Sequence, residues 1–200
     1  MTFSGRMSWC AIPARWTLER KRWSEAAELP VWHPDVRAYS VTKRGTGEQI
    51  GMFYRDDYAR EGKRSGAWHS AYRVRTRLLG DEIVLNSNNN NFTKPQPGEP
   101  VLISLDDAAT LFHEFGHALH YLTVDVSYPS FAGAQRDFVE YPSQVNENWL
   151  LTPAVLNRFA KHHKTGAPMP KSLVDKIQKA QTFNQGFDTV EYLSSAIIDM

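Results

Sequence analysis

Hydrophobic and polar residues alternate along much of the N-terminal half of the chain, whereas the C-terminal half follows a helical period. Val36 to Val41 alternates in this way, Gln49 to Tyr54 predicts a second strand, and Gly45 and Gly47 between them predict a hairpin turn. Glu82 to Leu85 predicts a further short strand. We therefore expect a small antiparallel sheet in the N-terminal half.

Three other segments of this half have weaker patterns. Trp16 to Ala27 has tryptophans and charged residues at helical spacing and is compatible with a helix. Trp68 to Leu79 is extended or irregular, and we expect its His69 to be at the surface or hydrogen-bonded. Asn86 to Asn91 is rich in asparagine, which favours turns, so it predicts a turn before a proline-containing loop.

The C-terminal half predicts a series of helices separated by loops that contain proline or glycine. Ser104 or Asp106 is a suitable N-cap for the first helix, Pro153 suits the first turn of the third, and Ser172 caps the fourth. The expected ranges are about 106–123, 137–151, 153–163, 172–183 and 189–200. Strands followed by helices indicate an α+β fold that is mainly helical.

The helix expected over 106–123 carries the sequence H-E-x-x-H. Its two histidines, His113 and His117, lie one helical turn apart on the same face. Two imidazoles in this relation can bind one tetrahedral Zn²⁺ and leave positions for a third protein ligand and a water. Glu114 lies one residue round the helix, where it can reach that water as a general base without binding the metal. The alternative is a surface helix with two solvated histidines.

A catalytic zinc site needs a third protein ligand. His120 faces roughly the same way as His113 but lies about 10 Å further along the helix axis. It is too distant to share one ion, so we expect it in the core or beside a ligand. The next helix offers Asp137, Glu140 and Glu147, and the residues alone leave all three open.

Composition limits the classes of function. The net charge of +1 gives no electrostatic reason to expect nucleic acid or a membrane surface as a partner. No apolar run approaches the length of about 18 residues that a membrane span needs. The first residues contain no continuous apolar stretch typical of a signal peptide. A single cysteine, Cys10, excludes an internal disulfide, and we expect a cytoplasmic protein.

Longer stretches of the sequence resemble a known family. The run from His113 to His120 (H-E-F-G-H-A-L-H), followed by Arg136 to Trp149 (R-D-F-V-E-Y-P-S-Q-V-N-E-N-W), resembles the M3 family of zinc oligopeptidases. That family includes the thimet oligopeptidases, oligopeptidase A and the dipeptidyl carboxypeptidases. Segments similar to the last two groups are Trp32–Val36, Tyr58–Trp68, Asn91–Pro95 and Phe183–Phe187.

The resemblance implies a zincin-like peptidase that acts on peptides with Zn²⁺ as its cofactor. It implies His113, His117 and Glu140 as the zinc ligands and Glu114 as the catalytic base. The resemblance covers residues 29–200, which we expect to be part of the catalytic domain, whereas residues 1–28 match the family poorly.

The sequence also departs from the family pattern. Family members are several hundred residues long, and a Gly-rich segment with His and Tyr residues, which holds the substrate carbonyl, follows the motif. The sequence stops at Met200, before that segment. A truncated zinc-binding fragment with little turnover is therefore the alternative to an active peptidase, and a structural or interaction module without metal is a third interpretation. Apolar surface left uncovered predicts self-association.

Overall fold

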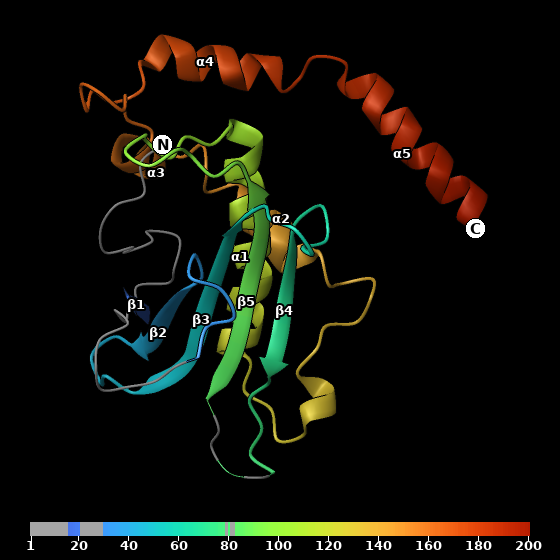
Figure 1. Ribbon diagram of the computed structural model, residues 1–200. Coiled ribbons are helices and arrows are strands. Elements are labelled where there is room, and N and C mark those ends of the chain that lie inside the picture. Colours follow the sequence, from blue (N-terminus) through green and yellow to red (C-terminus); the bar gives the residue numbers. More distant parts are fainter. Residues whose placement is uncertain (1–15, 21–29, 79, 81–82) are drawn as a thin grey trace.

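The computed structural model describes residues 16–20, 30–78, 80 and 83–200. In this part of the chain a five-stranded sheet lies against the long helix α1, and further helices follow along the chain (Figure 1). The strands are β1 (Trp16–Arg20), β2 (Arg37–Lys43), β3 (Gln49–Tyr58), β4 (Trp68–Arg73) and β5 (Val84–Phe92). Their order across the sheet is β1-β2-β3-β5-β4. The α+β class predicted from the sequence is confirmed.

The sheet is mixed. β1 pairs with β2, β2 with β3, and β4 with β5 in antiparallel fashion, and the predicted hairpin between β2 and β3 is confirmed. The expectation of a wholly antiparallel sheet is wrong for one pair, because β5 inserts between β3 and β4 and runs parallel to β3. β4 is therefore an edge strand, next to the strand that faces α1.

The helix considered for Trp16 to Ala27 is wrong in its first part, because residues 16–20 form strand β1. Trp16 pairs with Lys43 and Arg20 with Tyr39, so the backbone of this segment extends the edge of the sheet. Pairing with β2 overrides the local helical spacing. Residues 21–27 of the segment lie outside the described residues.

The turn predicted at Asn86 to Asn91 is also wrong, because these residues form the interior of β5. Asn86, Asn88 and Asn90 alternate along the strand and are fully buried. Asn86 Nδ2 donates to the carbonyl of Ala118 in α1 at 3.1 Å, and Asn90 Nδ2 donates to Asp57 Oδ1 at 3.3 Å. Amides that find such partners can be buried in a strand, which local turn preference does not anticipate.

Helix α1 (Leu105–Thr123) agrees with the prediction to within one residue at its start. Of the two predicted caps, Ser104 is the N-cap. The Asp107 N–H donates to Ser104 Oγ at 2.9 Å and the Ser104 N–H donates to Asp107 Oδ2 at 3.0 Å. This reciprocal pair satisfies two backbone donors at the start of the helix.

The apolar side of α1 packs on the sheet and forms the main core. Phe115 meets Phe53 of β3 edge-on, with ring centroids 5.2 Å apart. Gly51 of β3 leaves room for Leu122 of the same helix, since an added Cβ would lie 2.6 Å from Leu122 Cδ2. Burying one such phenylalanine stabilises the fold by about 1.5–3 kcal/mol, so this contact fixes α1 on the sheet.

The segments before and after β3 are tied together by Asp56. Its carboxylate accepts hydrogen bonds from Trp32 Nε1 at 2.8 Å, Arg60 Nη2 at 2.7 Å and Lys63 Nζ at 3.1 Å. Burial by itself would raise the pKa of Asp56, but these hydrogen bonds outweigh it and hold the pKa at about 2. The ionised Asp56 thus attaches the loop between β3 and β4 to the sheet.

The later helices differ from the predictions mainly at their ends. They are the 3₁₀ helix η1 (Pro129–Phe131), α2 (Tyr141–Glu147), α3 (Pro153–Phe159), α4 (Lys171–Ala180) and α5 (Gln185–Asp199). The second predicted helix is shorter than expected at both ends, and Pro142 stands in its first turn. Ser172 lies inside α4 and is not its cap, which is Pro170. Asn184, at a φ of 58°, makes the predicted break before α5.

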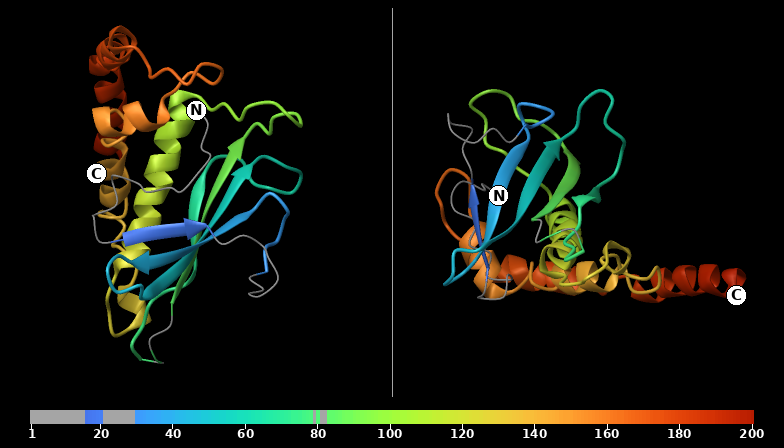
Figure 2. Two further views of the ribbon diagram at one scale, coloured as in Figure 1. Left: turned by 90° about the vertical axis from the view of Figure 1, so that its left-hand side faces the viewer. Right: turned by 90° about the horizontal axis from the view of Figure 1, so that it is seen from below.

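Helices α4 and α5 extend away from the sheet (Figure 2). None of their residues is buried. No helix within the described ranges combines the length and hydrophobicity that crossing a membrane requires.

Candidate metal centre

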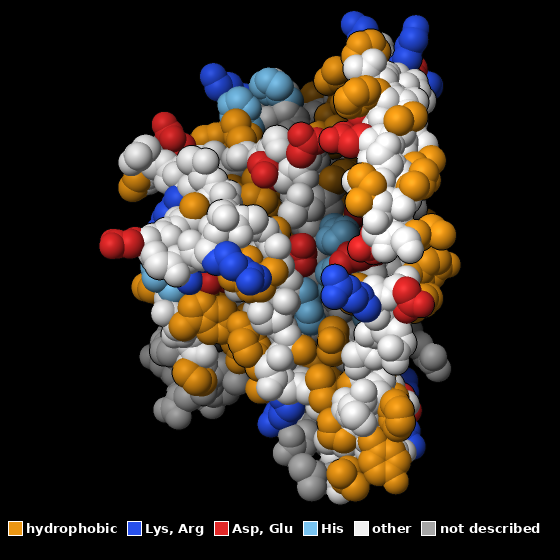
Figure 3. Space-filling view, turned by 90° about the vertical axis from the view of Figure 1, so that its right-hand side faces the viewer, with side chains coloured by type: hydrophobic (Ala, Val, Ile, Leu, Met, Phe, Trp, Pro, Cys, Tyr) orange, Lys and Arg blue, Asp and Glu red, His pale blue; other side chains and the backbone are white. Residues whose placement is uncertain are grey.

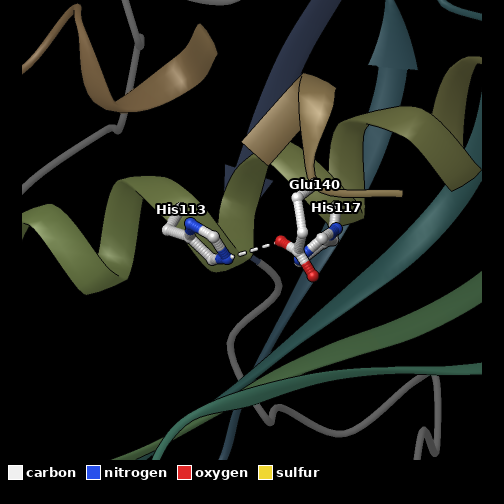
Figure 4. Close-up of side chains that lie close together, drawn as sticks. All are labelled: His113, His117 and Glu140. Carbon is white, nitrogen blue, oxygen red and sulfur yellow. Dashed lines mark ion pairs between the residues drawn. The ribbon is translucent and has the colours of Figure 1, made fainter. Parts of the chain in front are cut away.

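Helix α1 carries the H-E-x-x-H sequence on the side next to α2. His113 and His117 are partly buried, with ring centroids 5.0 Å apart and planes nearly perpendicular. Their Nε2 atoms approach one oxygen, Oε2 of Glu140, at 3.1 Å and 3.2 Å (Figure 4). One ligand atom from each of these three residues lies within 4.8 Å of the others.

Glu140 is the only one of the three open candidates that joins this group among the described residues. Asp137 is exposed in the turn before α2. Glu147 contacts the other nitrogen of the His113 ring, Nδ1. His120 is outside the group, as expected, and its ring lies 5.6 Å from that of Tyr121.

Glu140 reaches the histidines because α2 lies very close to α1. A Cβ added at Gly116 would lie 2.5 Å from Ser143 Cα and 2.6 Å from the Pro142 carbonyl oxygen, so only glycine permits this approach. Ser143 Oγ also donates to Glu140 Oε2 at 2.9 Å, which orients the carboxylate. Asn146 Nδ2 donates to the Phe112 carbonyl at 2.6 Å and ties α2 to α1.

Glu114, between the two histidines in the sequence, is buried, with 7% of its surface accessible. Burial raises the pKa of its carboxyl above the ordinary value. The charge of His113 lowers this pKa, the charge of Glu140 raises it, and the hydrogen bond from the His69 backbone N–H lowers it. The net increase makes Glu114 a stronger proton acceptor than an exposed glutamate.

The side chain of Asn88 in β5 holds the backbone of α1 at Glu114 and Phe115. In the amide orientation that satisfies both partners, its nitrogen donates to the Glu114 carbonyl at 3.1 Å and its oxygen accepts from the Phe115 N–H at 3.0 Å. No sequence pattern indicates a role at the site for Asn88, Ser143 or Asn146. The alternation of asparagines in steps of two is the one signal that could have indicated a buried strand face.

His69 of β4 lies next to the metal group, which the sequence did not indicate. It is only partly exposed, and its ring stacks on Tyr121 at 5.0 Å and lies 6.3 Å from that of His117. Its Nε2 is buried and has no hydrogen-bond partner among the described residues. Burial lowers the pKa of His69 to about 3, with smaller effects from His117 and His120, so its imidazole is neutral.

The three donor atoms fit a zinc ion. Ligand atoms of a tetrahedral zinc, each about 2.0–2.1 Å from the metal, lie about 3.3 Å apart. The two nitrogen–oxygen separations, 3.1 Å and 3.2 Å, are close to that value. Burial also lowers the pKa of His117, which favours the neutral imidazole that a metal needs. Two imidazoles and one carboxylate form a donor set of catalytic zinc sites with one position left open.

The site is accessible from one face of the molecule. Figure 3 shows histidine side chains at the bottom of a hollow, with carboxylates beside them and lysine or arginine side chains next to the hollow. Glu140 is the most exposed member of the group, with 53% of its side chain accessible. The metal group is therefore accessible from this face.

The two histidines of α1 face a carboxylate at the start of the next helix, and α1 rests on the sheet. The chain is therefore an α+β protein with a group able to hold a metal ion. Comparison with known proteins gives its family. The sequence model described as "Peptidase family M3" matches residues 18–200. The chain belongs to peptidase family M3.

Individual relatives agree with this family. The dipeptidyl carboxypeptidase of Escherichia coli (strain K12) is 42% identical over 178 residues, which cover 88% of this chain and 26% of that protein. Oligopeptidase A of the same strain is 37% identical over 182 residues, with 88% and 26% covered. The thimet-like oligopeptidase of Dictyostelium discoideum is 33% identical over 185 residues, with 89% and 28% covered. The chain thus spans about a quarter of the length of these relatives.

Proposed function

We propose that this chain forms the zinc-binding and water-activating part of a metallopeptidase that hydrolyses peptide bonds. The observation that carries the proposal is the convergence of His113 Nε2, His117 Nε2 and Glu140 Oε2 beside the buried Glu114. The names of the relatives, which are dipeptidyl carboxypeptidases and oligopeptidases, support a peptide as the substrate.

In this proposal His113, His117 and Glu140 are the zinc ligands. When bound there, Zn²⁺ supplies Lewis-acid chemistry, since it lowers the pKa of a water and polarises a carbonyl group. Ser143 keeps the Glu140 carboxylate turned toward the histidines through its hydrogen bond of 2.9 Å. The close contact of α2 with Gly116 keeps the three side chains at the distances that a tetrahedral ion requires.

Glu114 is the general base. Its carboxylate accepts a proton from the attacking water and passes it to the nitrogen of the leaving amine. The raised pKa allows Glu114 to hold that proton between the two steps. The His69 N–H and the contacts of Asn88 with the Glu114 backbone keep the side chain and its helix in place.

The arrangement of sheet, motif helix and following helix is zincin-like in this proposal, and residues 29–200 are part of the catalytic domain. A zinc-binding unit with little turnover is the second candidate function. The exposure of Glu140 favours it, because electrostatic stabilisation of a transition state is weaker where water has access.

The test compares zinc content and hydrolysis of short peptides for the wild type, Glu114→Gln and His113→Ala. We expect the wild type to bind zinc and cleave peptide, and Glu114→Gln to keep zinc and lose about 100-fold or more in rate. His113→Ala should lose both. Glu61→Gln, an exposed glutamate on the loop between β3 and β4, is the matched control.

The two candidate functions give different outcomes. Zinc binding without hydrolysis in the wild type favours the unit with little turnover. Hydrolysis by the wild type that Glu114→Gln leaves unchanged contradicts the peptidase proposal.

A further inference from the structure

The ring of His113 lies between two carboxylates that come from opposite ends of α2. Glu140, the N-cap of this helix, faces Nε2 of the ring at 3.1 Å. Glu147, its last residue, places Oε1 2.6 Å from Nδ1 of the same ring. The two nitrogens of one imidazole therefore have different acidic partners.

Glu147 was one of three residues that the sequence left open as the third metal ligand, and the geometry gives it a different place. Its carboxylate is not part of the group whose ligand atoms lie within 4.8 Å of one another. It contacts the nitrogen on the opposite side of the His113 ring from Glu140. Glu147 can therefore act on the metal group only through His113.

The shorter of the two contacts favours one nitrogen of His113 as the carrier of the hydrogen. Both ring nitrogens face a carboxylate oxygen, which accepts hydrogen bonds, but Nδ1 lies 2.6 Å from Glu147 whereas Nε2 lies 3.1 Å from Glu140, so Nδ1 is the favoured donor. In a neutral imidazole Nε2 then keeps its lone pair. This lone pair is on the side of the ring that faces Glu140, where a ligand atom is needed.

The backbone on both sides of the pair is fixed by neighbouring residues. Asn146, directly before Glu147, donates through Nδ2 to the carbonyl of Phe112, directly before His113, at 2.6 Å. Asn146 and Phe112 are both buried. Because this bond joins the residues next to the pair, Glu147 and His113 are held side by side although 40% and 26% of their side chains are accessible.

We propose that Glu147 is a positioning residue for the metal group, which holds His113 as the tautomer with Nδ1 protonated and Nε2 free to bind. The inference rests on the proposed function, because it requires His113 to be a metal ligand. The tautomer, however, is a property of the metal-free chain, so the two proposals can be tested separately.

The experiment uses the full chain with ¹⁵N-labelled histidine. Long-range ¹H–¹⁵N correlation spectra of the metal-free protein, recorded above the pH range in which imidazole is charged, identify the protonated nitrogen of His113. We expect Nδ1–H in the wild type and a mixture with Nε2–H in Glu147→Ala. Competition with a chelator should show about 10- to 100-fold weaker Zn²⁺ binding by Glu147→Ala.

Two further variants make the result specific. Glu147→Gln keeps an oxygen acceptor at the same reach, so it should preserve the Nδ1–H tautomer better than Glu147→Ala and lose less Zn²⁺ affinity. If Glu147→Ala does not fold, Glu147→Gln decides the question by the same two measurements. Gln144→Ala, an exposed residue of the same helix, should change neither.

The inference about Glu147 is overturned if His113 keeps the Nδ1–H tautomer in Glu147→Ala and Zn²⁺ affinity stays within about threefold of the wild type. Equal Zn²⁺ binding by the wild type and His113→Ala would instead contradict the proposed function. The tautomer measurement decides the role of Glu147 even in that case.

Discussion

Burial favours the neutral forms of the titratable side chains around Glu114. It raises the pKa of Glu114 and lowers the pKa of His69 and His117, because in each case the charged form loses hydration. For His117 the neutral form is the one that can bind a metal ion. His69 contributes differently, since its backbone N–H contacts Glu114 while its buried Nε2 has no partner among the described residues.

The first prediction concerns the pH dependence of stability and the side chain of His69. Its pKa is about 3 in the folded chain instead of 6.5. Between these two pH values the His69 imidazole is protonated in the unfolded chain and neutral in the folded chain. Folding stability is therefore lost as pH falls below about 6.5, by roughly 2 kcal/mol between pH 7 and pH 5. His69→Phe keeps a ring against Tyr121 and should remove the part of the loss that His69 causes.

Urea unfolding of the metal-free wild type and His69→Phe at both pH values measures the effect. The exposed His163→Phe is the control for adding a phenyl ring. An equal pH dependence in the wild type and His69→Phe would show that the His69 side chain is not the source.

The metal group depends on contacts between whole elements, and α1 is held from two sides. The sheet holds it through Asn86 and Asn88 of β5, which bond to its backbone. Helix α2 holds it through the close approach at Gly116 and the bond from Asn146. Glu140 and Glu147, which face the two nitrogens of His113, are carried by the same short helix. A small shift of α2 would therefore move both carboxylates.

The second prediction tests this contact with Gly116→Ala. Alanine in a helix is normally favoured over glycine by roughly 0.5–1 kcal/mol. At Gly116 the added methyl would lie 2.5 Å from Ser143 Cα, so α2 must move and stability should fall by about 1–3 kcal/mol. Zn²⁺ affinity should fall as well, because Glu140 moves with α2.

Gly186→Ala in α5 is the matched control, since its added Cβ would meet nothing within 4 Å. Urea unfolding and chelator competition measure both quantities. A Gly116→Ala protein as stable as the wild type, with equal Zn²⁺ affinity, would mean that the α1–α2 contact does not position Glu140.

The sequence predicted the elements that depend on local pattern and missed those that depend on distant partners. The helix with the H-E-x-x-H motif and the hairpin between β2 and β3 follow from periodicity, and the structure confirms both. The Asn-rich strand β5 could not be predicted locally, because the partners of Asn86 and Asn88 lie in α1. Trp16 to Arg20 is a strand only because it pairs with β2.

The candidate site was predictable in part for the same reason. Helical spacing places His113 and His117 on one face without any knowledge of the fold. Spacing does not identify the third residue, since Asp137, Glu140 and Glu147 all follow the motif helix and only the family resemblance implies Glu140. Only the packing of α2 against Gly116 distinguishes Glu140 from Glu147 physically.

In the part of the molecule that the structure describes, a packed core is followed by the C-terminal helices α4 and α5, which have no buried residues. The core lies between α1 and the sheet. The side chains of α5 are all exposed, and hydrophobic groups are uncovered on the face that Figure 3 shows. The exposed large hydrophobic residues of this helix are Phe187, Val190, Tyr192, Leu193, Ile197 and Ile198. A surface of this kind favours association.

The third prediction is that the 200-residue chain associates with copies of itself through α5. Light scattering at increasing concentration should show a rising molar mass for the wild type and a lower one for a Phe187→Gln, Ile197→Gln double variant, because both substitutions remove exposed apolar surface. Ser195→Gln on the same helix is the control. A wild type that stays monomeric over the whole concentration range would contradict this prediction.

The central claim is that Glu114 acts as a base beside a zinc ion held by His113, His117 and Glu140. The most direct test is the rate of peptide hydrolysis by the wild type relative to Glu114→Gln, measured at equal bound zinc. The account predicts a ratio of about 100 or more, because general-base catalysis is lost while the ligands stay in place. A ratio of one at equal zinc content, with measurable hydrolysis in both proteins, would contradict it.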